Sequence, residues 1–168
     1  MDARTPADSR SILVRWMGPT DANSAGFIHG GTVLRYCDEA AGLAAVRHSG
    51  SRVVTAALDR MTFLEPVNIG EVVSFKATVN AAWRTSVEVG VRVEAENPRT
   101  GEVRHTTTAY LTMVSLDDEG HPAPVPALQC EDETERRRER EAQLRRKNRL
   151  AEREQILQSR STGAAVES

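Results

Sequence analysis

The residues whose types and spacing could carry out chemistry lie between positions 21 and 39. Asn23 supplies a loop amide, Gly30 and Gly31 begin a helical stretch, and Asp38 follows inside it. The first N–H groups of a helix have no partner within it, and glycine lets a carbonyl oxygen approach them closely. With the Asn23 amide they are donors suited to an oxyanion, while Asp38 adds a carboxylate. This spacing indicates acyl-transfer chemistry.

Asp38 differs from its neighbour Glu39 in having no basic residue one helical turn away. Four residues before Glu39 stands Arg35, which predicts a surface ion pair, whereas Asp38 is flanked at that spacing by Leu34 and Gly42. A carboxylate in apolar surroundings loses hydration and becomes more reactive. The alternative is a structural Asp38 that caps a loop or pairs with a distant arginine.

The other polar groups also have structural interpretations. Asn23 in a glycine-containing loop can be only a turn residue, and a Gly-Gly pair can mark only a tight turn into a helix. His29 has no acidic partner fixed by the sequence. We therefore expect His29 to order the loop backbone rather than to act as a base.

The helix rise limits how these groups can cooperate. Eight residues separate Gly30 from Asp38, which is about 12 Å along a helix. A base or nucleophile must come within about 3–3.5 Å of its target. If the two groups act together, the site is shared by two chains and the active unit is at least a dimer.

One strand, one apolar helix and four further strands are predicted around these residues. Hydrophobic periodicity and Gly/Pro turn signals place the first strand at 11–17, the helix at 31–48 and the later strands at 52–61, 71–82, 86–96 and 102–115. The helix is apolar nearly all round, so other structure should cover it. We predict an α+β hotdog fold, an antiparallel sheet wrapped around a central buried helix.

Length and composition are those of one globular domain. The 168 residues are 39% hydrophobic and 27% charged with a net charge of −2, so no bulk field attracts nucleic acid or an anionic membrane. We expect a flexible segment at 1–10 and the domain at 11–128. No signal core or membrane-length apolar run is present. Cys37 and Cys130 are predicted to be free thiols of a cytoplasmic protein, and no His/Cys cluster predicts a metal site.

The composition changes after Gln129. Residues 129–160 alternate acidic and basic side chains and predict a charged helix, followed by a disordered tail at 161–168. The basic runs around Arg137 and Arg146 are similar to those of leucine-zipper DNA-binding proteins. Interleaved glutamates and the lack of a leucine repeat argue against nucleic-acid binding. We expect a solvated helix lying on a neighbouring subunit.

The chain from about residue 11 to 128 resembles the hotdog acyl-CoA thioesterases, in particular the group of the animal brain-type long-chain acyl-CoA hydrolase. The combination of motifs is specific, although no single one is. The matching stretches are Asp21–Gly31, Cys37–Gly42, Val53–Asp59 with Phe63, Trp83–Ser86, Val114–Leu116 and Pro124–Pro126.

The resemblance implies hydrolysis of fatty acyl-CoA to free acid and coenzyme A. Asp38 would be the nucleophile or general base, and Asn23 would complete the site from a partner domain. The residues implied to border substrate, water or coenzyme A are Thr55, His29, Arg84, Thr85 and Ser86. No cofactor is implied, since coenzyme A belongs to the substrate, and the expected assembly is a trimer of dimers.

Two other functions fit the same fold. A hotdog hydratase or dehydratase needs a well-placed histidine beside its acid, for which His29 is a weak candidate. A non-catalytic acyl-CoA sensor needs no catalytic groups, and the presence of both Asn23 and Asp38 argues against it.

Overall fold

The computed structural model describes residues 1–164 of the chain, with side chains through residue 160. Its elements in chain order are α1 (Pro6–Ser9), β1 (Ser11–Trp16), the 3-10 turn η1 (Pro19–Asp21), α2 (Gly30–Ser49), β2 (Arg52–Phe63), β3 (Val72–Ala82), β4 (Ser86–Glu96), β5 (Val103–Leu116) and α3 (Glu133–Ala164).

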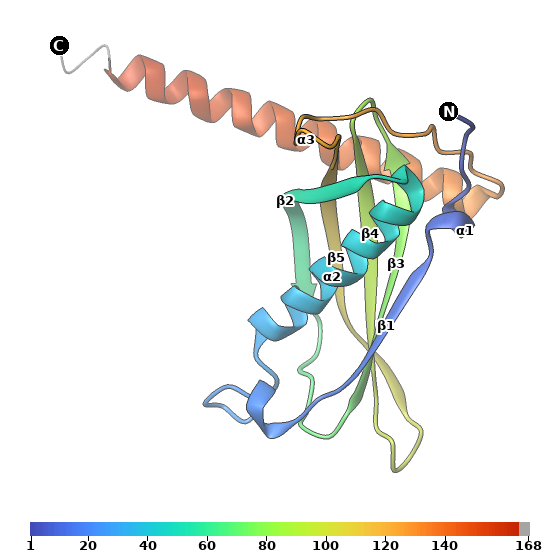
Figure 1. Cartoon of the computed structure of the whole chain (residues 1–168). Coiled ribbons are helices and arrows are strands. Elements are labelled where there is room, and N and C mark those ends of the chain that lie inside the picture. Colours follow the sequence, from blue (N-terminus) through green and yellow to red (C-terminus); the bar gives the residue numbers. More distant parts are fainter. Residues whose placement is uncertain (165–168) are drawn as a thin grey trace.

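The five strands form one antiparallel sheet in the order β1-β3-β4-β5-β2. β1 and β2 are therefore the two edges. The helix α2 lies along one face of the sheet and α3 crosses the opposite face (Figure 1). This arrangement confirms the predicted hotdog fold with a long C-terminal helix, and element bounds differ from the predicted ones by a few residues.

Small apolar side chains seat α2 on the sheet. Ala40, Ala41, Ala44 and Ala45 are fully buried against strands whose inward residues are mostly valine. Alanine keeps the helix axis close to the sheet and loses no side-chain entropy on burial. Gly50 ends the helix in the left-handed conformation (φ 70°), and its N–H donates to the Val46 carbonyl at 2.8 Å.

One stripe of α2 and the β2 edge remain apolar and open to solvent in the single chain. Leu43 and Val46 of α2 are 37% and 42% exposed, and Val54 and Leu58 of β2 are 47% and 40% exposed. The predicted covering of α2 is thus incomplete within one chain. An edge strand with exposed apolar side chains is a surface suited to pairing.

The N-terminal segment differs from the flexible stretch predicted for 1–10. Residues 6–9 form the short helix α1, in which Ser9 is buried and its hydroxyl accepts a hydrogen bond from the Val79 N–H at 3.0 Å. Arg4 pairs with Leu128 in an isolated bridge. These contacts place residues 4–9 in the folded body, because Ser9 is bonded to β3 and Arg4 is paired with Leu128.

The first part of the C-terminal helix is docked on its own sheet, which corrects the expectation that the helix is solvated along its whole length; its predicted contact with a neighbouring subunit stays a prediction. Asp132 caps α3 by accepting from the Glu135 N–H at 2.8 Å. Farther along, Arg145 donates to both carboxylate oxygens of the fully buried Glu88 at 3.0 and 2.6 Å. Arg149 then pairs with Asp59 of β2.

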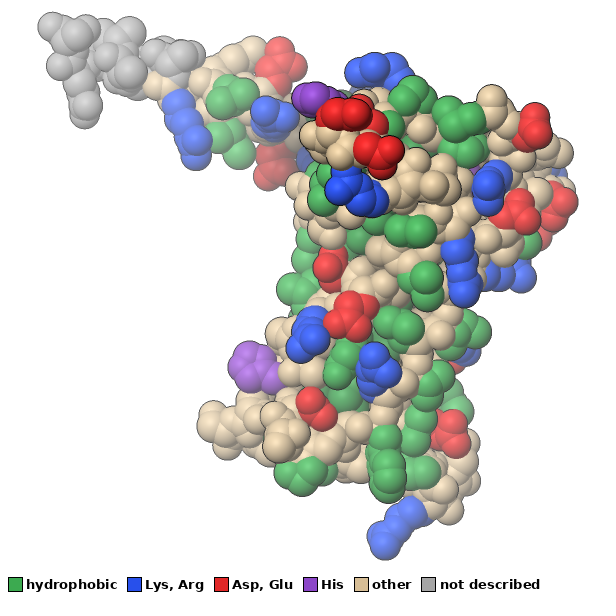
Figure 2. All heavy atoms as spheres, viewed as in Figure 1, with side chains coloured by type: hydrophobic (Ala, Val, Ile, Leu, Met, Phe, Trp, Pro, Cys, Tyr) green, Lys and Arg blue, Asp and Glu red, His purple; other side chains and the backbone are tan. Residues whose placement is uncertain are grey.

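The tail prediction for 161–168 is wrong in its first half. Residues 161–164 continue α3, and residues 165–168 lie outside the described part of the chain. Residues 150–160 are exposed and extend beyond the sheet, as the projecting end of the molecule in Figure 2 shows. Within the described residues, none of the helices has the length and apolarity needed to span a membrane.

Candidate active site

Asp38 and Thr55 meet although they come from different elements. Asp38 lies midway along α2 and is half-buried, and its Oδ1 accepts a hydrogen bond from Thr55 Oγ1 at 2.5 Å. Thr55 stands on the edge strand β2, beside a β-bulge, with its Oγ1 3.3 Å from Met113 Sδ. The hydrogen bond to Thr55 leaves the second carboxylate oxygen free to act.

Arg35, the arginine of α2 that precedes the two carboxylates, pairs with Glu39 and not with Asp38. Arg35 Nε donates to Glu39 Oε1 at 3.0 Å, which confirms the predicted ion pair. No lysine, arginine or histidine of residues 1–160 forms an ion pair with Asp38. Asp38 is therefore held by a neutral hydroxyl, as a base or nucleophile would be, because a salt bridge would reduce its reactivity.

His29 orders the start of α2, as expected. It is the N-cap residue, and its Nδ1 accepts a hydrogen bond from the Gly31 N–H at 3.2 Å. This contact consumes the Gly31 N–H within the chain. By contrast, the Gly30 N–H has no acceptor among the described residues. Of the two predicted backbone donors, only Gly30 remains available.

Loop hydrogen bonds fix the orientation of the Asn23 amide. Its Oδ1 accepts from the N–H groups of Ala25 and Phe27 at 2.9 and 3.3 Å. Two backbone donors determine which end of the amide is oxygen, so the NH₂ group must point elsewhere. Asn23 is therefore both the predicted turn residue and a positioned hydrogen-bond donor.

Asn23 and Gly30 border one hollow of about 350 Å³, with Phe27, Phe63 and Val67 among its other walls. A Cβ on Gly30 would lie 3.3 Å from the Phe63 ring, so glycine permits this close packing. Phe63 was not predicted as a site residue, because a single aromatic at the end of a strand has no distinctive spacing. Met113, beside Thr55, was missed for the same reason.

The chain thus contains two separate groups of candidate residues. Asn23 and Gly30 lie at the N-terminal end of α2, while Asp38 and Thr55 lie eight helical positions farther along. At 1.5 Å per residue the separation along α2 is about 12 Å. The structure does not bring the two groups together within one chain.

The turn Arg84–Ser86 lies at the far end of the sheet. The Arg84 carbonyl accepts from the Val125 N–H at 3.1 Å, and the adjoining Pro126 contacts His48 near the C-terminus of α2. Arg84 is exposed, Thr85 is half-buried and Ser86 is buried. These residues are therefore remote from Asn23 in the same chain.

The cysteines carry no reactive thiolate. Both are free, as predicted. Burial, with a smaller contribution from Asp38, raises the pKa of Cys37 to about 12, and burial likewise raises the pKa of Cys130 to about 11. Each thiol stays protonated near neutral pH. Among the described residues, no group of three His, Cys, Asp or Glu side chains could hold a metal ion.

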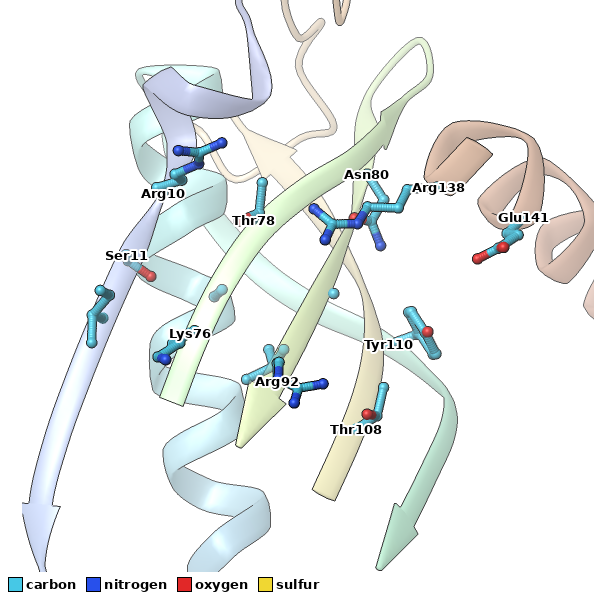
Figure 3. A pocket seen from close by; sticks show the side chains of 14 residues that line it. Arg10, Ser11, Lys76, Thr78, Asn80, Arg92, Thr108, Tyr110, Arg138 and Glu141 are labelled. Carbon is cyan, nitrogen blue, oxygen red and sulfur yellow. The ribbon is translucent and has the colours of Figure 1, made fainter. Parts of the chain in front are cut away.

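A further hollow of about 460 Å³ lies on the outer face, between the first turns of α3 and the sheet. Figure 3 shows Thr78, Asn80, Tyr110 and Arg92 around it. None of the predicted catalytic residues reaches this hollow, because Asp38 projects from α2 on the other face. It is not a candidate for the acyl-transfer site.

Comparisons with known proteins point to one family. Residues 25–102 match the thioesterase superfamily model. The chain is 35% identical over 142 residues to protein VdlD of Helicobacter pylori, covering 84% of this chain and 80% of that protein. It is 33% identical to the rat cytosolic acyl coenzyme A thioester hydrolase, covering 83% of this chain but 37% of that longer protein.

Solved structures extend the similarity to nearly the whole chain. An acyl-CoA hydrolase from Staphylococcus aureus, in complex with butyryl coenzyme A and coenzyme A, is 32% identical with a TM-score of 0.87, covering 96% of this chain and 99% of that one. An apo hexameric acyl-CoA thioesterase is 39% identical with a TM-score of 0.87, covering 90% and 97%.

The antiparallel sheet around a long central helix is the hotdog fold. The chain belongs to the acyl-CoA thioester hydrolases of the thioesterase superfamily.

Proposed function

We propose that this protein hydrolyses fatty acyl-CoA at sites shared between two copies of the chain. One copy supplies Asp38 and Thr55, and the other supplies Asn23 and the Gly30 N–H. The observation that carries the proposal is the separation of these two groups along α2, together with the free donor at Gly30. A hexameric assembly of the similar thioesterase supports a trimer of such dimers.

The spacing of residues replaced in the Staphylococcus aureus enzyme supports this choice of side chains. Its alanine variants alter an asparagine, an aspartate 15 positions later and a threonine 17 positions after that. Asn23, Asp38 and Thr55 have the same spacing in this chain. The agreement supports a joint role for the three residues.

Each group has a definite part in the proposed reaction. The thioester oxygen accepts hydrogen bonds from Asn23 Nδ2 and the Gly30 N–H, which stabilise the negative charge that develops on it. Asp38 either removes a proton from water, whose oxygen then attacks the carbonyl carbon, or attacks that carbon itself to form an anhydride that water cleaves. The carbon–sulfur bond breaks, and the coenzyme A thiolate takes up a proton.

The supporting residues position these groups. Thr55 orients the Asp38 carboxylate through its hydroxyl, and His29 holds the start of α2 in place through Gly31. The exposed Arg84 is suited to a coenzyme A phosphate, whereas Thr85 and Ser86 shape the turn that presents it. The reaction needs no group beyond side chains, water and substrate, and we place it in the cytoplasm.

The apolar surfaces that remain exposed support the pairing. Leu43 and Val46 of α2 and Val54 of β2 would be buried if two β2 edges joined around a two-fold axis. Such an axis reverses the direction of α2 in the second copy. It therefore moves the N-terminal end of one α2 toward the middle of the other, which is the displacement the site requires.

A subunit-mixing experiment tests the shared site. We expect Asp38→Asn to lower the rate of coenzyme A release by about 10²–10⁴-fold and Asn23→Ala by about 10²–10³-fold. In a mixed dimer of the two variants, one site carries both lesions and the other carries neither. Co-refolding equal amounts should therefore restore about a quarter of the wild-type activity.

Three results would contradict the proposal. Mixed subunits that remain inactive, while forming dimers, would place both groups in a single-chain site. An active Asp38→Asn enzyme would remove Asp38 from the chemistry. If the wild-type protein binds acyl-CoA without releasing thiol, the sensor function replaces hydrolysis.

A further inference from the structure

The helix α3 crosses the whole outer face of the sheet and then continues past it. Glu135 lies 3.9 Å from Arg10 beside β1, Arg145 pairs with Glu88 of β4, and Arg149 reaches Asp59 of the edge strand β2. Residues 150–164 therefore extend beyond the edge, in the direction that Figure 1 shows. At 1.5 Å per residue this arm is about 22 Å long.

The arm, residues 150–164, carries exposed apolar side chains. Leu150, Ile156 and Leu157 are 48%, 44% and 53% exposed. The arm also carries Glu152, Arg153 and Glu154, none of which forms an ion pair with the described residues. A helix end with no tertiary contact is marginal in water, so these leucines and the isoleucine are expected to have a partner.

A groove of about 720 Å³ runs beside α3 on the same outer face. Its apolar walls are Leu58, Leu64 and Leu144, which are 40%, 55% and 56% exposed. Arg60 also lines it and has no ion-pair partner among the described residues. The groove thus offers apolar contacts together with two charged side chains that form no ion pair with the described residues, Arg60 of β2 and Glu152 of α3.

The shared site fixes where a second copy would lie. For the shared site to form, Thr55 of one copy must lie beside Gly30 of the other copy. Within each chain Gly30 packs on Phe63 of β2, so Phe63 marks the position of Gly30 along that strand. In an antiparallel pair of β2 edges, matching Thr55 with Phe63 puts the two-fold axis close to Asp59, midway between them. This is the strand position where α3 crosses β2.

Two α3 helices crossing so near the axis must lie side by side and antiparallel. Packed helices are about 8–10 Å apart, which equals about three residues along a strand. The groove lies within this distance of the crossing point at Asp59, since Arg60, Thr62 and Leu64, the residues that follow Asp59 along β2, line it.

We propose that the arm of each subunit fills the groove of its dimer partner. Leu150, Ile156 and Leu157 would pack on Leu58, Leu64 and Leu144, and the arm's glutamates would face Arg60. The inference rests on the proposed function through the position of the two-fold axis. It assigns α3 a role as a clasp between the two subunits that form a shared site.

Cross-linking of exposed positions tests the clasp. We would co-express a Leu64→Cys chain with a Leu157→Cys chain, both carrying Cys130→Ser, and treat the protein with a short bis-maleimide. The native Cys37 is fully buried and should not react. We expect a covalent species of about twice the 18.4 kDa chain mass, which neither chain gives alone. Leu157→Cys with Val103→Cys, at an exposed site elsewhere on the sheet, is the matched control.

The outcomes separate this inference from the proposed function. Cross-linked dimer from the Leu64 pair but not from the Val103 pair supports the clasp. Equal or absent cross-linking in both pairs overturns it. Subunit mixing of the Asn23 and Asp38 variants tests the shared site independently of the cross-link. Restored activity without a specific cross-link would therefore reject the clasp and leave the shared site intact.

Discussion

The two long helices lie on opposite faces of one sheet and are held there in contrasting ways. α2 buries alanines and a valine against the strands and carries the half-buried carboxylate of Asp38 beside them. α3 is rich in charge and docks through arginines, of which Arg145 forms a two-point contact with Glu88. Burial of small apolar groups determines one position, and directed ion pairs determine the other.

The difference shows how similar docking can serve different purposes. Close-packed alanines hold the α2 backbone rigidly, as a catalytic acid needs. A buried ion pair adds little net stability but tolerates few alternative positions. Although burial opposes the charge of Arg145, its hydrogen bonds to Glu88 raise the pKa of Arg145, so the guanidinium stays charged. The ion pair therefore fixes where α3 lies on the sheet but contributes little net stability.

The largest expected effect comes from breaking that pair. Arg145→Met leaves the Glu88 carboxylate buried without its partner, which costs about 3–5 kcal/mol while α3 remains docked. We expect α3 to detach and hydrate Glu88, with a large increase in amide exchange along the helix. Arg137→Ala, which removes an exposed pair with Glu141, is the control and should cost about 0.3–0.5 kcal/mol.

A double variant makes the test specific to charge. Adding Glu88→Leu to Arg145→Met removes both buried charges, and stability should return to near the wild-type value. If the double variant is as unstable as the single one, packing rather than the ion pair holds α3.

A smaller effect distinguishes packing on the two faces. Ala44 of α2 and Ala142 of α3 are both fully buried. Ala44→Leu overfills the main core and should lower the free energy of unfolding by about 1–3 kcal/mol. Ala142→Leu should instead loosen α3 alone, which limited proteolysis would detect while the unfolding midpoint of the sheet is nearly constant. Equal global destabilisation would show that α3 belongs to the main cooperative unit.

The sequence predicted α2 better than α3 for a physical reason. Local periodicity and the Gly30 and Gly50 boundaries are visible in the chain, so the strands, α2 and the ion pair of Glu39 could be predicted. The docking of α3 depends on Glu88, 57 residues before Arg145, and no local pattern reports such a contact. The sequence predicted that His29 orders the backbone, but it did not show which atom His29 would bond. In the structure its Nδ1 accepts from the Gly31 N–H, which removes one of the two predicted glycine donors.

The smallest expected effect is a pH response confined to the α2 side. His48 is fully buried, its Nε2 donates to the Pro126 carbonyl at 3.0 Å, and its Nδ1 has no hydrogen-bond partner. Burial lowers the pKa of His48 below its ordinary 6.5, despite the bond to Pro126; Arg4 lowers it further and Asp8 acts in the opposite sense.

The sign of the effect follows from proton binding. As pH falls through 6.5 the unfolded chain takes up a proton on His48 while the folded one does not, so stability present above pH 6.5 is lost toward the folded pKa. On α3, hydrogen bonds from Arg140 and Arg136 lower the pKa of Glu133 below 4.5, so the contribution of Glu133 is lost only in stronger acid. Urea unfolding should show that the free energy of unfolding of the wild type falls between about pH 7.5 and 5.5. In His48→Gln, which keeps a donor for Pro126, this free energy should depend less on pH. Matching profiles would mean that His48 titrates alike in both states, and the acid response would then belong to surface carboxylates rather than to the core under α2.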